Sequence, residues 1–187
     1  MRLSDLLDFL AGLFVHKPRN IGAKTLPTQT QEFAVIGLGR FGFSLAKRLV
    51  SLGHTVLGVE RDSAISQQYA DELTQTVSLD STDEDALREV DITSYETVVV
   101  AIGTNFEANV MTTVALKELG VRNVICKAAT LRQRDILLRV GADRVVLPEH
   151  EGGARVAQEL ATPGILDEIR LFEEVKVSEL RVPRRLS

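Results

Sequence analysis

The chain has 187 residues, of which 44% are hydrophobic and 26% charged, enough for one sizeable core with short appendages. Its formal net charge of −4 argues against a general nucleic-acid-binding protein, because such proteins usually carry a basic face. The single cysteine, Cys126, excludes an internal disulfide and any multi-cysteine metal site. Because it lies inside an apolar run, we expect a buried structural thiol in a reducing compartment.

The N-terminal stretch predicts a short amphipathic helix, because leucines recur there at helical spacing. Asp5 and Asp8 make it a poor signal peptide, and it is too short to span a bilayer. We expect it to pack against its own domain or a neighbouring subunit, with docking to a membrane surface or membrane partner as the alternative. Residues 18–31 contain prolines and a glycine without apolar periodicity and are predicted to be a linker.

The run from Phe33 to Gly42 predicts a strand, a phosphate-binding loop and the start of a helix. In such a motif Gly37 permits the tight turn, Gly39 lets the backbone approach a pyrophosphate, and Gly42 lets helix and strand pack closely. Phosphates would lie at the helix N-terminus, where unpaired N–H groups and the helix dipole favour anions.

A second apolar run, Thr55–Val59, ends in Glu60, about 20 residues beyond the glycines. That is the position expected for a carboxylate that binds a ribose. The alternative is that Glu60 only begins a solvated turn.

The remaining chain alternates short apolar runs with helical patterns. Further strands are predicted at Thr76–Leu79, Val98–Ile102, Val124–Cys126 and Val145–Leu147. Helices are predicted to stop at Gly53, Gly120 and Gly141. One short helix, through Val90, is predicted to begin with a capping box formed by Ser81 and Glu84.

This alternation predicts an α/β fold, a Rossmann-like doubly wound sheet of six parallel strands. A ligand crevice would lie beyond the carboxyl ends of the strands. Polar and glycine residues gather at those predicted ends, namely Gly37 to Gly42, Glu60, Asp80 to Thr82, Gly103 to Asn105, Lys127 and Glu149.

After the sixth strand, a helix is predicted from Gly152 to Pro163, and Ile165–Phe172 is predicted to form a second short helix. Glu173–Val177 is predicted as a strand. A last strand without a partner is unstable. We therefore expect this end to be a fragment of a second module, either truncated or complete only in an oligomer.

Residues for acid–base or nucleophilic catalysis are sparse. The three histidines are scattered, and the His150 side chain beside Glu149 is interpreted as part of a surface turn, with a catalytic pair as the alternative. No substrate domain follows the predicted nucleotide fold, which would supply a cofactor site but not a reaction. We therefore expect the chain not to be an enzyme.

Three stretches together resemble the RCK family (regulator of potassium conductance), also called KTN. These are Phe33–Gly42, Val98–Gly103, and Ile136 to Glu149 with its Gly141-Ala-Asp-Arg-Val145 centre. The resemblance covers roughly residues 32–175. Members of the RCK family are cytosolic nucleotide-binding gating subunits of bacterial potassium channels and transporters of the Ktr and Trk type.

The expected domains are residues 1–31 (amphipathic helix and linker), 32–162 (nucleotide-binding domain) and 163–187 (hinge and start of a C-terminal module). The resemblance implies the last two, and the N-terminal helix is an extension beyond the family core. The resemblance also implies dimers assembled into an octameric ring against the cytosolic face of a membrane potassium transporter. The protein would then be cytoplasmic and peripheral at the inner face of the plasma membrane. ATP, ADP or NAD(H) would act as regulatory ligands, not as reactants, and nucleic acid would not be a partner.

Carried over by position, the residues expected to bind the nucleotide are Gly37, Gly39, Arg40, Phe41, Glu60, Arg61, Asp80, Ser81, Thr82, Ala101, Gly103 and Lys127. Glycines and Arg40 would contact phosphates, Glu60 the ribose, and Asp80 to Thr82 the adenine. Lys127 would approach the phosphates from the opposite wall, and Glu149 would join a cation site for Mg²⁺, Ca²⁺ or Na⁺.

Two features depart from the family pattern: Glu60 stands where the family usually has aspartate, and most of the C-terminal ligand-binding module has no counterpart here. Surface roles remain the alternatives for Arg40, a solvated side chain at a helix start, and for Lys127, a snorkelling lysine. Two other functions remain open, an NAD-dependent oxidoreductase fragment that lacks its catalytic domain and, more distantly, a transcriptional redox sensor.

Overall fold

The computed structural model describes residues 30–161, 165–172 and 175–180 of the chain. Its strands are β1 (Glu32–Ile36), β2 (Thr55–Glu60), β3 (Gln75–Ser78), β4 (Thr97–Val100), β5 (Asn123–Lys127), β6 (Arg144–Val146), β7 (Ile165–Phe172) and β8 (Val175–Leu180). Its helices are α2 (Arg40–Ser51), α3 (Ser63–Gln68), α4 (Glu84–Glu89), the 3-10 helix η1 (Ile92–Ser94), α5 (Phe106–Glu118), α6 (Leu131–Arg139) and α7 (Pro148–Ala161). The predicted N-terminal helix lies outside the described residues.

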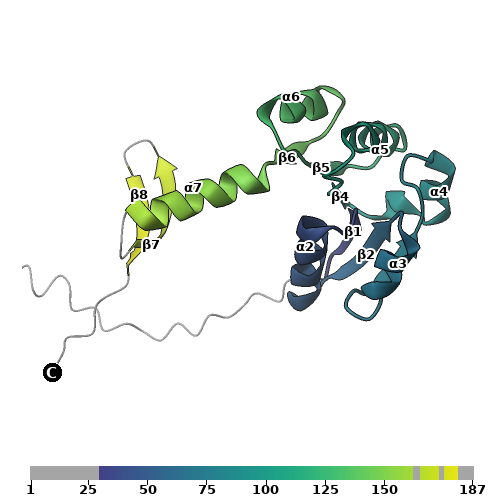
Figure 1. The fold of residues 1–187 in the computed structure, drawn as a ribbon, viewed down its shortest axis with the longest axis horizontal. Coiled ribbons are helices and arrows are strands. Elements are labelled where there is room, and N and C mark those ends of the chain that lie inside the picture. Colours follow the sequence, from purple (N-terminus) through teal and green to yellow (C-terminus); the bar gives the residue numbers. More distant parts are fainter. Residues whose placement is uncertain (1–29, 162–164, 173–174, 181–187) are drawn as a thin grey trace, which may run out of the picture. The chain divides into compact units, whose positions relative to one another are not determined.

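Six strands form one parallel sheet in the order β3-β2-β1-β4-β5-β6, which confirms the predicted doubly wound fold (Figure 1). The register aligns Ile36 at the end of β1 with Val59 on β2 and Val100 on β4. Chain order reverses between β1 and β4. In sheets of this kind, ligands bind beyond the carboxyl ends of the strands at such a reversal.

The two faces of the sheet bury two separate apolar clusters, because neighbouring strand residues point to opposite faces. On one face, Val35 and Val99 pack in a cluster with residues of α2 and α3, such as Ala46 and Ile65. On the other face, Ile36, Val98 and neighbours pack in a cluster with residues of α4, α5 and α6. Burying a side chain of this size contributes about 1.5–3 kcal/mol, so the sheet and the loops at its edge rest on a rigid base.

Helices α2, α5 and α6 end as expected, with positive φ at Gly53, Gly120 and Gly141. The start predicted for α4 was wrong. Asp83 is its N-cap and accepts hydrogen bonds from the N–H groups of Asp85 and Ala86. Ser81 instead forms a buried hydrogen bond with Thr112 on α5, with 2.9 Å between the two hydroxyl oxygens. Its side chain therefore packs in the core and does not cap the helix.

The helix predicted at Ile165–Phe172 was also wrong, because this segment is β7, which pairs antiparallel with β8. The spacing of Ile165, Ile169 and Phe172 fits a helix locally, but strand pairing with a later segment decides the structure. The last strand was predicted at Glu173–Val177, and β8 runs from Val175 to Leu180. It has a partner, so the expectation of an unpaired last strand was wrong.

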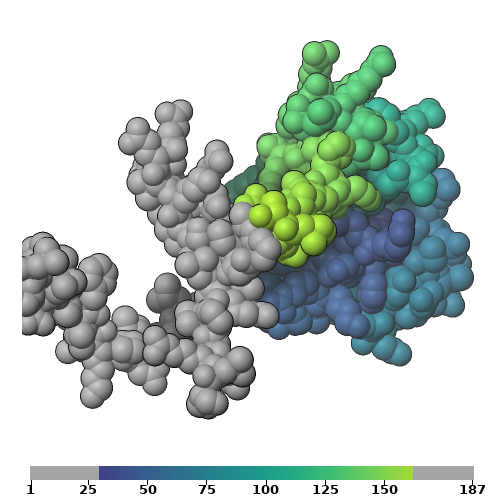
Figure 2. Space-filling view, turned by 60° about the vertical axis from the view of Figure 1, so that its left-hand side comes forward, coloured from purple at the N-terminus to yellow at the C-terminus, as the bar shows by residue number. Residues whose placement is uncertain are grey.

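Helix α7 begins at Pro148, a favoured first helical residue, four residues earlier than expected. Residues 149–161 of α7 are all exposed, including Val156 and Leu160, and the helix is coloured yellow-green in Figure 2. In the part of the chain that the structure describes, no helix is long and apolar enough to cross a membrane. The domain boundaries at residues 31 and 162 stay a prediction.

Candidate functional site

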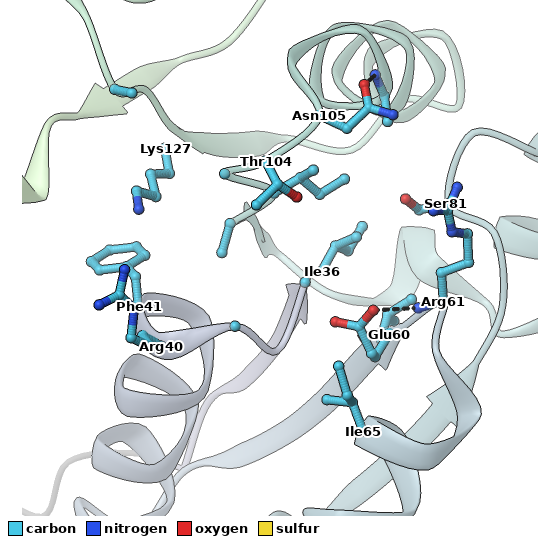
Figure 3. Close-up of a pocket in the computed structure, with 18 of the residues that line it drawn as sticks. Ile36, Arg40, Phe41, Glu60, Arg61, Ile65, Ser81, Thr104, Asn105 and Lys127 are labelled. Carbon is cyan, nitrogen blue, oxygen red and sulfur yellow. Dashed lines mark hydrogen bonds between the residues drawn. The ribbon is translucent and has the colours of Figure 1, made fainter.

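A pocket of about 960 Å³ opens at the carboxyl ends of the parallel strands (Figure 3). Its volume lies at the upper end of the range typical for small-molecule sites. The residues predicted to bind the ligand that line it are Gly37, Gly39, Arg40, Phe41, Glu60, Arg61, Asp80, Ser81, Ala101, Gly103 and Lys127, together with Glu149. Thr82 does not line the pocket. Its position supports Asp80, as described below.

The glycine loop between β1 and α2 has the geometry that the sequence motif predicts. Gly37 has a φ of +92°, and its N–H donates to Val59 O at 2.7 Å. A Cβ atom on Gly42 would lie 1.9 Å from Gly37 O, so only glycine lets α2 approach the loop this closely. Gly39 differs from both, because it has no atom within 4 Å of the Cβ position and therefore faces open space.

Gly39 is also the N-cap of α2 and provides no side-chain hydrogen bond to the first turn. The first N–H groups of this 12-residue helix therefore lack a capping side chain. Such a helix start attracts an anion through its free N–H groups and its dipole.

Glu60, the last residue of β2, binds three backbone amides in this structure. Its Oε2 accepts from Leu38 N at 2.8 Å, and its Oε1 accepts from Arg61 N at 2.9 Å and Asp62 N at 3.2 Å. The carboxylate thus joins the glycine loop to the start of α3. A carboxylate offers about four acceptor positions, so this arrangement leaves Glu60 one position for a further hydrogen-bond donor, such as a single ribose hydroxyl.

Asp80 follows β3 and is held as a carboxylate. The backbone N–H and the hydroxyl of Thr82 both donate to Asp80 Oδ1, at 3.0 and 2.7 Å, and they keep the pKa of Asp80 below its ordinary value. Ser81 is buried through its contact with Thr112. Figure 3 places Glu60, Arg61 and Ser81 on one side of the pocket, away from Lys127.

Arg40, Phe41 and Lys127 gather on the other side of the pocket (Figure 3). Lys127 Nζ lies 5.8 Å from the centre of the Phe41 ring and donates to Glu149 Oε1 at 2.9 Å. The hydrogen bond from Lys127 lowers the pKa of Glu149, and the charge of Arg40 adds to the effect. Only 15% of the Lys127 side chain is exposed, so Lys127 is a largely buried residue of the pocket lining and not a solvated surface lysine.

Several lining residues were missed as binding residues. Thr104 and Asn105 belong to the segment after β4, which the sequence identified as a strand end without a role. Asn105 caps α5, with its side chain accepting from Ala108 N at 3.0 Å. Ile36, the last residue of β1, and Val59, the residue before the end of β2, also line the pocket. An apolar residue near a strand end gives no sign in the sequence that it does so.

The expected cation site at Glu149 has no complete set of protein ligands. No group of three His, Cys, Asp or Glu side chains in the described part of the chain is placed to hold a metal ion. Glu149 itself pairs with Lys127. A cation would need most of its oxygen ligands from elsewhere, so these residues alone do not fit one.

Cys126 is fully buried, as expected, and touches Thr113 Oγ1 at 3.2 Å. Burial raises the pKa of its thiol to about 11, against the smaller opposite effect of the Thr113 contact. The thiol is therefore a structural group and not a nucleophile at neutral pH.

Known proteins resemble this chain in sequence and in fold. The sequence model of the TrkA-N domain matches residues 33–148. The Ktr system potassium uptake proteins A and C of Bacillus subtilis are 39% and 38% identical, each over 84% of this chain and 71% of the relative. The TrkA-N domain of the inner membrane protein ybaL from Escherichia coli superposes with a TM-score of 0.62 at 19% identity, covering 71% of this chain and 98% of that one.

Two structures of GsuK with nucleotides share the same fold. The GsuK channel bound to NAD has a TM-score of 0.57 at 18% identity, over 77% of this chain and 27% of that chain. GsuK bound to ADP has a TM-score of 0.59 at 17% identity, over 84% of this chain and 44% of that chain. These likenesses confirm the Rossmann-like fold, and the potassium uptake relatives confirm the expected resemblance to RCK and Ktr subunits. The chain belongs to the TrkA-N family and is related to the Ktr system potassium uptake proteins.

Proposed function

We propose that the chain is a cytosolic regulatory subunit that binds an adenine nucleotide and thereby gates a membrane potassium transporter or channel. The observation that carries this proposal is the division of charge in the pocket, with Arg40 and Lys127 on one side and the Glu60 carboxylate on the other. The start of α2, whose first residue is Arg40, has no capping side chain and adds free N–H groups to the pocket. Such a pocket suits an elongated ligand with an anionic end and a hydroxyl-bearing middle.

The chain's own residues would bind the nucleotide as follows. Phosphates would be held by the glycine loop and by the cations Arg40 and Lys127, through charge-assisted hydrogen bonds. Glu60 would accept a hydrogen bond from a ribose hydroxyl, while Asp80 and Ser81 would lie beside the adenine. Structures of GsuK have been solved with NAD bound and with ADP bound, which supports ATP, ADP or NAD(H) as the ligand here.

The same proposal includes the assembly. Ktr uptake relatives support a membrane potassium transporter as partner, and the family resemblance supports dimers arranged as an octameric ring at the inner face of the plasma membrane. An oxidoreductase fragment is not supported, because the reported sequence relatives are potassium uptake proteins.

The test compares Lys127→Met with Lys47→Met by calorimetric titration of ADP. Lys47 is a matched control, since it lies on α2 outside the pocket, pairs with Glu72, and loses the same charge. One charge-assisted phosphate contact is worth about 1.5–3 kcal/mol. We therefore expect Lys127→Met to bind ADP about 10- to 150-fold more weakly than wild type, with Lys47→Met unchanged. Wild-type protein that binds no adenine nucleotide, with copurifying ligands absent by mass spectrometry, would overturn the proposal.

A further inference from the structure

The inner face of α5 carries three polar residues beside the apolar Ala115 and Leu116, where the helix packs on the sheet. Asn109, Thr112 and Thr113 are at most 1% exposed, although they occupy positions where an apolar residue would pack without needing a hydrogen-bond partner. Met111 on the same helix is 51% exposed instead. Buried polar groups are usually hydrogen-bonded, so the partners of these three side chains indicate what the polar face does.

Asn109 links the ends of two strands. Its Nδ2 donates to Ile102 O at 2.8 Å, just beyond β4, and to Lys127 O at 3.0 Å, at the end of β5. Both partners are acceptors, so the amide must present its NH₂ group to them. Its Oδ1 is buried and accepts no hydrogen bond from the described residues. The polar function of this side chain is therefore the double donation.

Both carbonyl groups belong to residues that line the pocket. From its fixed backbone, the Lys127 side chain passes Gly103, with Nζ 3.5 Å from the point where a Cβ on Gly103 would stand. It then reaches Phe41 and Glu149. The location of the ammonium group thus depends on where the end of β5 is held relative to the end of β4, and Asn109 supplies hydrogen bonds to both.

We propose that Asn109 is a positioning residue that sets the Lys127 ammonium group for contact with the phosphates of the ligand. The inference rests on the proposed function, because it needs an anionic ligand at Lys127. Asn109 does not line the pocket. Its effect on binding therefore passes through Lys127 and affects the phosphate end of the ligand, not the adenosine end.

The experiment uses Asn109→Asp, which keeps the shape of the side chain but replaces the donor with an acceptor facing two carbonyl oxygens. Asn109→Ala is the second variant. It removes the side chain with little strain on the helix, and it decides the outcome if Asn109→Asp does not fold. Thr113→Val is the matched control on the same helix. Thr113 is equally buried, but its partners are Asn109 O and Cys126 Sγ, and neither residue lines the pocket.

The measured quantity is the affinity for ADP divided by the affinity for adenosine, obtained by calorimetry and competition. We expect Asn109→Asp to lower this ratio about 10-fold or more, and Lys127→Met to lower it similarly. The double variant should lose little more than either single variant, since both changes act on one contact. Thr113→Val should keep the ratio within about twofold while it lowers the melting temperature, as loss of a buried hydroxyl contact does.

The outcomes separate the two proposals. If wild type binds ADP no better than adenosine, the proposed nucleotide function fails, and this inference fails with it. If Lys127→Met lowers the ratio but a folded Asn109 variant does not, the function stands and Asn109 has no positioning role. Equal losses of ADP and adenosine affinity in the Asn109 variants would assign the residue a purely structural role and overturn the inference.

Discussion

Two glycines of the phosphate loop should respond in opposite ways to the same added methyl group. In Gly42→Ala, the new Cβ would lie 1.9 Å from Gly37 O and 2.9 Å from Ala101 Cβ, so α2 and the loop must move apart by about 1 Å. In Gly39→Ala, the new Cβ would have no neighbour within 4 Å, and the φ of −67° suits any residue. The first change strains the fold, and the second intrudes only on space for a ligand.

The expected magnitudes follow from these geometries. Overpacking of this kind typically costs 1–3 kcal/mol, which lowers the melting temperature of a chain this size by roughly 2–4 °C per kcal/mol. Alanine at the N-cap is less favourable than glycine, but it restricts the unfolded chain and recovers about 0.4–1 kcal/mol. Gly39→Ala should therefore melt within a few degrees of wild type.

ADP affinity should respond to the Gly39→Ala change, although thermal stability hardly does. A methyl group at Gly39 keeps a phosphate from the N–H groups at the start of α2, and losing one charge-assisted bond of about 1.5–3 kcal/mol weakens ADP binding about 10- to 150-fold. Thermal unfolding without ligand and calorimetric titration with ADP measure the two effects. A Gly39→Ala protein that melts like wild type and also binds ADP with wild-type affinity would refute the phosphate-loop interpretation.

Two further predictions concern charged groups. Because Arg40 stands at the mouth of the glycine loop, we propose that it reaches the terminal phosphate of ATP, which ADP lacks. Arg40→Ala should then keep ADP affinity and lose much of its ATP affinity, and an unchanged ratio of ATP to ADP affinity by calorimetry would exclude that role. Burial opposes the charge on Asp143, yet the Val124 N–H at 2.7 Å and the Lys117 ammonium at 2.9 Å together hold the pKa of this carboxyl below its ordinary value. Because the pKa is lower in the folded state than in the unfolded state, the charged carboxylate stabilises the protein above about pH 4. This stabilisation is lost as the pH falls through the folded-state pKa. Asp143→Asn should therefore be less stable than wild type at pH 7 by urea denaturation, and the gap should shrink below pH 4, whereas a constant gap would show that charge is not its cause.

Local patterns were sufficient to predict the parallel sheet and most of the pocket. Each strand of the sheet is a short apolar run bounded by turns, and parallel strands bring their carboxyl ends to one edge. Residues far apart in sequence, such as Glu60 and Lys127, could therefore be placed at the same edge without knowledge of any contact between them. Whether they bind a nucleotide stays a prediction.

The failures were decided by interactions that the local sequence does not contain. Ile165–Phe172 has apolar spacing that suits a helix, but its backbone pairs with β8. Ser81 has the spacing of a capping residue, but Asp83 caps the helix, and Ser81 meets Thr112 across the core. The buried position of Asn109 could have been predicted from the sequence. Asn109, Thr112 and Thr113 stand at i, i+3 and i+4, which predicts one polar face on a helix between apolar strands.

The charges around the pocket also determine which way round a nucleotide would lie. Phosphates beside Glu60 and Asp80 would face two carboxylates, and the lowered pKa of Asp80 means that its charge persists at neutral pH. Like charges at such short range disfavour that orientation, whereas Arg40 and Lys127 attract phosphates to the opposite side. Glu60 also binds Leu38 N of the glycine loop, so the group that would select a ribose helps to shape the loop that would hold the phosphates. A phosphate on the ribose would be repelled by the same carboxylate, which favours NAD(H) over its 2′-phosphorylated form.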